Sequence, residues 1–202
     1  MKNIELLAPA GNFEKLRFAL HYGADAVYCA GKSFGLRAFA GNFSDEELEE
    51  AVNYTHARGK KIYVTLNMYP HNEQLEGLEE YLAFLNRIQP DAILVADPGV
   101  YSFTQAMDFT VPIHISTQAT IVNWAGVKFW QEQNGIERVV LARELSLDEI
   151  ETISQKTETE LEIFVHGAMC MSYSGRCLLS NYMTGRDANQ GECAQPCRWN
   201  YA

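Results

Sequence analysis

The sequence predicts an α/β protein of the (β/α) TIM-barrel-like type, built as an incomplete barrel of about seven parallel strands followed by a cysteine-rich loop segment. Seven short β-rich runs alternate with helical patterns over residues 1–167. The runs are almost continuously apolar, as in parallel strands that are covered on both faces. The first run is followed by "APAGNF" rather than the G-x-G-x-x-G turn of a dinucleotide-binding sheet, which disfavours a doubly wound fold.

The expected strands follow one another with a helix in most of the intervals between them. We place the strands at residues 4–10, 26–31, 61–67, 92–97, 113–118, 138–144 and 161–167. Helical patterns occupy residues 13–23, 44–60, 74–88, 123–135 and 146–156. A complete barrel has eight such units in about 250 residues. Since the chain has 202 residues, we expect an incomplete barrel and a further C-terminal region of the full-length protein outside this sequence.

Helix boundaries carry their own chemical signals. Ser44 with Glu47, and Ser146 with Glu149, fit a capping box, in which the Ser oxygen accepts a free backbone N–H and the Glu reaches back to the cap. Glycines suited to a left-handed residue after a helix stand at Gly23, Gly59 and Gly135. We therefore expect residues 1–167 to form the barrel-like part and residues 168–202 to be a cysteine-rich segment of the same domain.

Composition and charge restrict the class of protein. Hydrophobic residues make up 47% of the chain and charged residues 21%, which indicates one globular domain rather than disorder. The net charge of −10 does not by itself predict a nucleic-acid partner, because such surfaces normally carry a basic patch. We find no apolar run of about eighteen residues and no signal peptide, so we expect no membrane association and a cytoplasmic protein.

Polar residues follow the expected strands at their carboxyl ends, where barrel enzymes place their sites. Arg143, Glu144 and His166 are the catalytic candidates, because adjacent opposite charges make poor core residues. Asn67 and Gln118 are candidates for substrate binding. The alternatives are that these are ordinary polar loop residues and that His166 is a hydrogen-bonded core histidine. We expect Cys29, which stands alone in an apolar run, to be a small buried hydrophobe.

Four of the five cysteines fall within 28 consecutive positions. Cys170, Cys177, Cys193 and Cys197 form a C-x6-C-x15-C-x3-C pattern, and in a reducing compartment such a pattern indicates metal binding or catalysis rather than disulfides. Four thiolates can hold zinc or an iron–sulfur cluster. The first pair is too wide for a zinc knuckle and suits a cluster better, although spacing alone leaves the metal open.

Arginines are interleaved with these thiols. Arg176, Arg186 and Arg198 would offset the negative charge of a thiolate centre or bind an anionic substrate beside it. The alternative is that they are solvated loop charges.

The stretch "EIFVHGAMCMSYSGRCLLS", residues 162–180, resembles the signature of the collagenase-like peptidase family of unassigned catalytic type. The flanks "ELLAPAG", "GADAVYCAG", "HISTQATIVNWAGVKFWQ" and "VLARELSLDEI" are similar to the tRNA uridine hydroxylases of that family. The resemblance implies a barrel-like N-terminal part and hydroxylation of the wobble uridine of tRNA to 5-hydroxyuridine, in a pathway tied to prephenate. Related branches hydroxylate ribosomal RNA or ubiquinone precursors, and several carry a 4Fe–4S cluster.

The resemblance also implies roles for individual residues. The family's cluster ligands fall on Cys170, Cys177 and Cys193, with Cys197 as the fourth unless that ligand lies further along the chain. The remaining roles come from our hydroxylase hypothesis and not from the family: we expect phosphate or prephenate carboxylates to contact three arginines, namely Arg143, Arg176 and Arg186. Proton transfer would fall to Glu144 or His166. The partner is then tRNA, bound with basic surface in the absent C-terminal region.

Two other functions compete with an RNA-modifying hydroxylase. A cysteine peptidase would need a thiolate paired with His, and His166 stands four residues before Cys170, but H-E-x-x-H of a zinc peptidase does not occur in the sequence. A non-catalytic module would use the four thiols for structural zinc, which is also expected in the hydroxylase when it is purified in air. In either case exposed sheet edges could be covered in a homo-oligomer.

Overall fold

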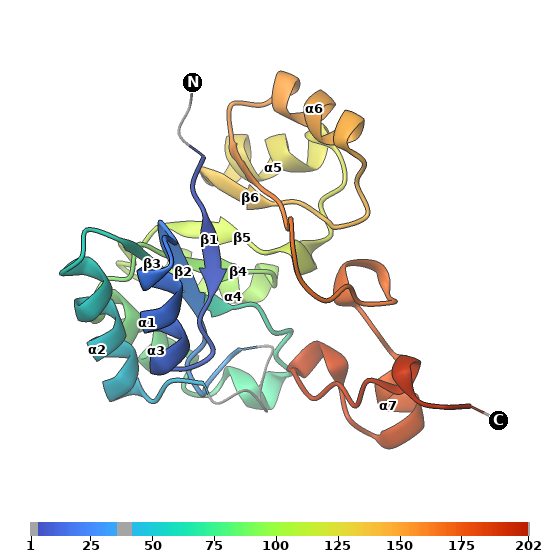
Figure 1. Ribbon diagram of the computed structural model, residues 1–202, viewed down its shortest axis with the longest axis horizontal. Helices are drawn as coiled ribbons and strands as arrows, with labels where there is room; N and C mark the ends of the chain where they lie inside the picture. The colour runs from blue at the N-terminus through green and yellow to red at the C-terminus, as the bar shows by residue number, and fades with distance from the viewer. Residues whose placement is uncertain (1–3, 36–41, 202) are drawn as a thin grey trace.

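The computed structural model describes residues 4–35 and 42–201 and contains a seven-stranded parallel sheet (Figure 1). The strands are β1 (Leu7–Pro9), β2 (Ala26–Cys29), β3 (Lys61–Leu66), β4 (Ala92–Val95), β5 (Ile113–Ile115), β6 (Arg138–Val140) and β7 (Glu160–Glu162). The α-helices are α1 (Phe13–His21), α2 (Asp45–His56), α3 (Leu78–Ile88), α4 (Pro98–Ala106), α5 (Trp124–Asn134), α6 (Leu147–Lys156) and α7 (Leu179–Thr184). Short 3-10 turns are η1 (Asn72–Leu75), η2 (Thr117–Ala119), η3 (Tyr173–Gly175), η4 (Ala188–Gln190) and η5 (Pro196–Arg198).

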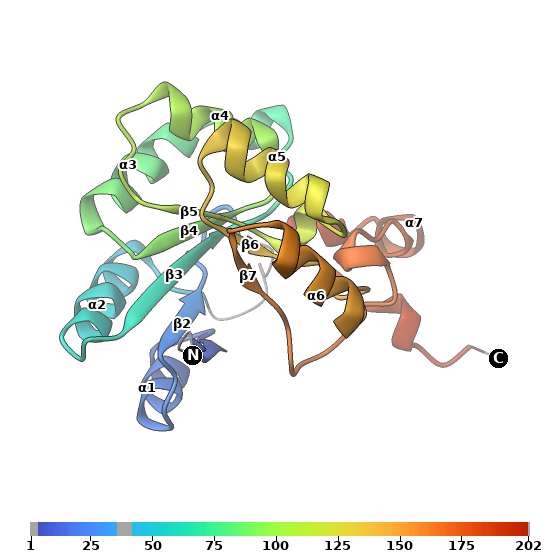
Figure 2. The same ribbon diagram turned by 90° about the horizontal axis from the view of Figure 1, so that it is seen from above.

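Each strand pairs in parallel with the strand that precedes it in the chain, in the order β1-β2-β3-β4-β5-β6-β7. The sheet curls, and helices α1 to α6 lie around its outside (Figure 2). The predicted incomplete (β/α) barrel is therefore confirmed. The strands are shorter than predicted: the expected strand 4–10 is Leu7–Pro9 and the expected strand 161–167 is Glu160–Glu162, because apolar runs continue beyond the last paired residue.

Two apolar layers hold the sheet. The larger lies between the sheet and the helices, where Val64 and Ile93 pack with helix residues such as Leu48 and Leu82. A smaller layer lies on the opposite face of the strands and includes Tyr63 and Leu94, among others. Alternation of side chains along each strand produces this division. Cys29 is 3% exposed in the larger layer, which confirms its predicted role as a buried small side chain.

Charged residues fill the inner face of the curled sheet at the amino ends of its strands. The Arg138 guanidinium, on β6, donates to the Glu5 carboxylate at 2.7 Å and to the Tyr63 hydroxyl at 3.1 Å. It also donates to Glu160 on β7 at 2.7 Å, and the Tyr63 ring meets the His114 ring at 5.0 Å between centroids. One side chain thus links β6 and β7 to the segment that precedes β1, which helps to keep the sheet curled.

The predicted helix boundaries agree with the observed ones where local chemistry sets them. Ser44 N donates to Glu47 Oε2 at 2.8 Å, and Glu47 N donates to Ser44 Oγ at 3.2 Å. Ser146 N donates to Glu149 Oε2 at 2.8 Å in the same way. Gly135 ends α5 with φ of 67°. In the described part of the chain, no helix is long and apolar enough to cross a bilayer.

Candidate active site at the carboxyl edge of the sheet

A polar network occupies the carboxyl edge of β3 and β5. Asn67, which follows β3, donates through Nδ2 to Ser116 Oγ at 3.3 Å and to Gln118 Oε1 at 3.2 Å. The Ser116 hydroxyl also donates to Gln118 Oε1. Ser116 is 2% exposed and Asn67 is 9% exposed, so these polar groups lie in the interior and are satisfied by one another, as buried polar groups require. The structure thus brings together Asn67 and Gln118, two of the four predicted substrate-binding residues.

A second set of contacts attaches the cysteine-rich segment to this network. Arg176 donates through Nε to the Gln118 carbonyl at 3.1 Å, and its terminal nitrogen donates to the Tyr69 hydroxyl. The guanidinium carbon lies 4.7 Å from the centre of the Tyr69 ring, within the range of a cation–π contact. The Tyr69 hydroxyl in turn donates to the Gln118 carbonyl. Burial raises the pKa of Tyr69, although Arg176 opposes that rise.

Glu144 is the second attachment point of this segment. The backbone N–H of Ser174 donates to Glu144 Oε1 at 2.6 Å, and Ser174 Oγ donates to Glu144 Oε2 at 2.9 Å. Partial burial raises the pKa of Glu144, but the two Ser174 hydrogen bonds, together with the Glu144 backbone N–H and the charge of Arg143, outweigh it and leave that pKa below its ordinary value. Both oxygens are therefore engaged as acceptors, and the ionised carboxylate positions the segment against the barrel.

Of the other two catalytic candidates, Arg143 acts on Glu144 through its charge, which helps to lower the pKa of that carboxylate, and His166 does not join this group. The Arg143 guanidinium carbon lies 4.3 Å from the centre of the Phe164 ring, and His166 is exposed in the stretch that leads from β7 to the cysteines. Among the described residues, no hydrogen bond or ion pair connects His166 with Glu144 or with a cysteine. The predicted catalytic set of Arg143, Glu144 and His166 is thus not gathered around one point in this conformation.

The four clustered cysteines lie along the segment that crosses this edge. Cys170 and Cys177 are half-buried, whereas Cys193 and Cys197 are exposed, and all are free thiols. Over residues 4–35 and 42–201, no group of three or more His, Cys, Asp or Glu side chains is close enough to hold a metal ion. The chemistry of four thiols suits an iron–sulfur cluster, but their arrangement in this conformation does not fit one.

Within the cysteine-rich segment, Cys177 lies among hydrogen-bond donors. Partial burial raises its pKa, but hydrogen bonds from the Ser172 side chain and from the backbone of Ser180 and Leu179 outweigh this and leave the pKa of Cys177 below its ordinary value. The Asn189 side chain also donates to the Cys177 carbonyl at 3.2 Å. A more acidic thiol is a better metal ligand and a better nucleophile, so this environment is compatible with both of these chemistries.

Arg186 turns back on its own segment, since its Nε donates to the Glu192 carbonyl at 3.0 Å. The residues that sequence reasoning missed are Tyr69, Ser116 and Ser174. A signal for Tyr69 exists in the sequence, because it stands two residues after the strand-end residue Asn67. Ser174 gave no such signal, because its contact with Glu144 spans 30 positions.

A curled parallel sheet with helices outside, polar side chains at the carboxyl edge and a thiol-bearing segment across that edge defines a protein of the (β/α) barrel class with an edge site. Within that class the chain belongs to peptidase family U32, whose family model matches residues 11–202. The solved structure of the U32 peptidase Mk0906 superposes with a TM-score of 0.65 at 17% identity, over 80% of this chain and 68% of that one. At this identity the likeness shows the fold alone.

The curated relatives carry different names. The chain is 52% identical to "tRNA hydroxylation protein P1" of Bacillus subtilis strain 168, over 99% of this chain and 47% of the relative. It is 41% identical to "23S rRNA 5-hydroxycytidine C2501 synthase" of Escherichia coli strain K12, over 98% of this chain and 30% of the relative. It is 33% identical to "Collagenase" of Porphyromonas gingivalis, over 100% of this chain and 50% of the relative. The chain therefore spans half or less of the length of these relatives.

Proposed function

We propose that the protein to which this chain belongs is an RNA-modifying hydroxylase, with the wobble uridine of tRNA as its target. The observation that carries this proposal is the 52% identity, over 99% of the chain, to a protein named for tRNA hydroxylation. A second relative is named for the synthesis of 5-hydroxycytidine in ribosomal RNA. Both names describe hydroxylation of RNA, and the second names a pyrimidine, which supports that chemistry for the edge site described above.

The carboxyl edge supplies what such a substrate needs. Gln118 is half-buried at the end of the sheet and accepts a hydrogen bond from the buried Asn67, and we propose that its amide, held in place by Asn67, recognises the polar edge of a base. The segment that carries the thiols is less acidic than the chain as a whole. Residues 163–202 hold three arginines against Asp187 and Glu192, a net charge of +1 in a chain whose total is −10. This segment would therefore repel RNA less than the acidic chain does on average.

Hydroxylation of a pyrimidine is a two-electron oxidation, which protein side chains do not perform without a cofactor. We propose that Cys170, Cys177 and Cys193, with Cys197 or a later residue as the fourth ligand, bind a 4Fe–4S cluster after the segment rearranges. The lowered pKa of Cys177 supports its use as a thiolate ligand. We also propose that prephenate is the linked substrate. Its carboxylates would contact Arg143, Arg176 and Arg186.

The test of the cluster is a measurement of iron, sulfide and the visible spectrum on full-length protein purified without air. We expect about four irons per chain from the cluster type and their loss in Cys193→Ala. Cys29→Ser is the matched control, because Cys29 lies in the apolar core. Stoichiometric zinc without sulfide in protein never exposed to air would contradict the cluster and support the structural-zinc module.

The test of the hydroxylase is nucleoside analysis of tRNA from cells that lack the gene and from cells complemented with variants. We expect 5-hydroxyuridine to disappear without the gene, to return with the wild type and to fall at least about tenfold with Arg176→Ala, which loses its contacts to Tyr69 and Gln118. Arg17→Ala, on α1 away from the edge, is the control. Unchanged 5-hydroxyuridine without the gene would contradict the proposal. Cleavage of collagen peptides that Cys177→Ala abolishes would instead support a peptidase.

A further inference from the structure

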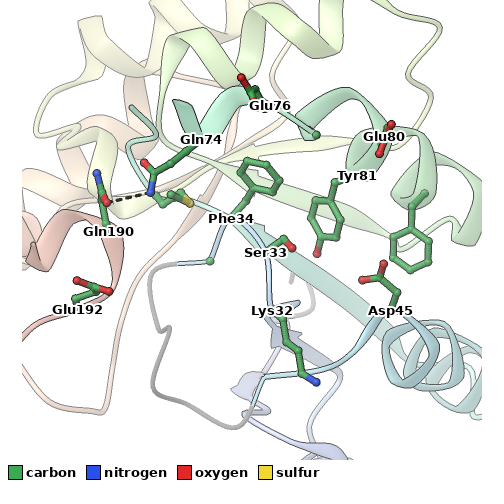
Figure 3. A pocket seen from close by; sticks show the side chains of 14 residues that line it. Lys32, Ser33, Phe34, Asp45, Gln74, Glu76, Glu80, Tyr81, Gln190 and Glu192 are labelled. Carbon is green, nitrogen blue, oxygen red and sulfur yellow. Dashed lines mark hydrogen bonds between the residues drawn. The ribbon is translucent and has the colours of Figure 1, made fainter. Parts of the chain in front are cut away.

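A cavity of about 560 Å³ lies beside the edge site and is lined by other residues. Figure 3 shows it between the loops that follow β2 and β3, the beginnings of α2 and α3, and the cysteine-rich segment. Its volume is that of a small-ligand site. Two of its lining residues, Gln190 and Glu192, belong to the stretch between Cys177 and Cys193. The cavity is therefore shared between the barrel and the segment that carries the thiols.

The charge of the lining is strongly acidic. Among the described residues, one cation, Lys32, and four carboxylates line the cavity: Asp45, Glu76, Glu80 and Glu192. A phosphate or a carboxylate ligand would be repelled by this set. A bare metal ion is also a poor occupant, since no group of three or more acidic, His or Cys side chains in the described ranges is close enough to hold one. Carboxylates spread around a ligand-sized space suit a cation whose donors are spread over several atoms.

Tyr81 supplies an independent indication of a ligand. It is 6% exposed, and among the described residues its hydroxyl has no hydrogen-bond partner. Leaving a buried hydroxyl unpaired costs about 1–3 kcal/mol, so such a group in a cavity wall is expected to have a partner that the protein alone does not supply. Figure 3 shows the Tyr81 ring directed into the cavity, next to Phe34, at 5.6 Å between ring centroids.

Gly31 makes room for this hydroxyl. A Cβ atom at position 31 would lie 2.1 Å from the Tyr81 hydroxyl oxygen, so any larger residue would displace the tyrosine. Burial raises the pKa of Tyr81, which keeps the phenol protonated and able both to donate and to accept. On the opposite side, Gln74 Nε2 donates to Gln190 Oε1 at 3.0 Å and connects the two parts of the wall.

We propose that this cavity binds an organic cation, an ammonium or guanidinium group, between the carboxylates of Asp45 and Glu80 on the barrel and of Glu192 on the cysteine-rich segment. Tyr81 accepts a hydrogen bond from the same ligand. Because Asp45 and Glu80 are exposed to solvent, each contact is screened, and affinity in the micromolar to millimolar range is expected. Occupancy holds the segment near Cys193 against the barrel. The proposal concerns binding alone and does not rest on the hydroxylase function.

The experiment is calorimetric titration of the full-length protein with two probes, spermidine and N-acetyl-arginine amide. Spermidine represents a free polyamine and the arginine derivative represents a protein side chain, so the stronger binder identifies the source of the cation. We expect binding that weakens with salt and falls at least about tenfold in Glu80→Gln and in Glu192→Gln, since each removes an ionic contact. Glu79→Gln is the matched control, because Glu79 is the neighbouring exposed residue on α3 and does not line the cavity.

Two further measurements test cation binding without relying on a variant that could misfold or on an activity assay. Tyr81→Phe removes a hydroxyl without a described partner, so we expect the unliganded variant to be at least as stable as the wild type but to bind the probe more weakly. Saturation with the better probe is expected to slow alkylation of Cys193, which follows Glu192 directly. The proposal is overturned if neither probe binds at millimolar concentration, if citrate binds as well as the cations, or if Glu80→Gln and Glu79→Gln bind alike. None of these results depends on RNA hydroxylation.

Discussion

On the inner face of the sheet, the pKa values of the half-buried Glu162 and the buried His114 are shifted in opposite directions by the same cause. Burial raises the pKa of Glu162 to about 7, although Arg138 opposes the rise. Burial, assisted by the charge of Arg138, lowers the pKa of His114 to about 3. Burial disfavours the charged form of either group. Near pH 6 both side chains are therefore mostly neutral in the folded protein, whereas the unfolded chain ionises Glu162 and partly protonates His114.

Replacing Glu162 with Gln is predicted to change the pH dependence of stability in a definite direction. In the wild type, the protonated form of Glu162 contributes to the free energy of unfolding. This contribution is fully present below about pH 4.5 and is lost as the pH rises through about 7. The variant has no such loss, so its free energy of unfolding relative to wild type should increase from pH 4.5 to 7 and then level off. The total is of order 3 kcal/mol. Urea denaturation at four pH values measures it.

The control for this prediction is Glu158→Gln, which changes an exposed carboxylate two residues before β7 begins. Its stability curve should run parallel to the wild-type curve between pH 4.5 and 8. If Glu162→Gln also runs parallel, then Glu162 is not held neutral by burial, and its pKa lies in the ordinary range.

Residue by residue, the sequence indicated site positions only where a strand end marks them. Asn67 and Gln118 were found from the rule that barrel sites lie at the carboxyl ends of strands, and the structure connects them at 3.2 Å. Glu144 was identified as a proton carrier, yet both of its oxygens accept hydrogen bonds from Ser174. Chain-distant contacts of this kind leave no local pattern, so the sequence could not show that Glu144 holds a loop.

The cysteine-rich segment is held by few contacts, and Glu144 provides two of them. We predict that Glu144→Ala loosens this segment without unfolding the barrel, because the lost hydrogen bonds to Ser174 join two elements rather than stabilise one. Alkylation of Cys177 should become several-fold faster and amide exchange over residues 170–178 should increase. Mass spectrometry measures both, with Glu137→Ala as an exposed control. Equal alkylation rates in the two variants would show that Glu144 does not hold the segment.

Elements were predictable to the extent that nearby residues define them. Both capping boxes form as predicted, since Ser44 with Glu47 and Ser146 with Glu149 are three residues apart. Strand ends were placed too far toward the carboxyl side, as with Arg138–Val140 for the expected strand 138–144. Helix α4, Pro98–Ala106 between β4 and β5, was not predicted, because it has no charged residues that would form a polar face. The end of a strand depends on how far it pairs with its neighbouring strand, and the residues of one strand alone do not determine this.

For the whole molecule, alternation of apolar runs and amphipathic segments was sufficient to predict a curled parallel sheet, and the structure confirms it. The same pattern does not predict how the four clustered thiols are arranged in space. Counting cysteines indicates a metal centre, but their positions depend on glycine-rich loops such as that at Gly175, with φ of 83°. Cytoplasmic location and association of two copies remain predictions that the fold does not address.

The strand order has a consequence for how the protein is made. Because every strand pairs with the one before it, the sheet can grow on the ribosome from its amino end, each new strand adding to an edge already in place. Contacts within each step are close in sequence, which favours fast assembly. The ion pair between Arg138 and Glu5 spans 133 positions. It can form only when β6 has emerged, so the charged interior closes late in synthesis, after most of the sheet already exists.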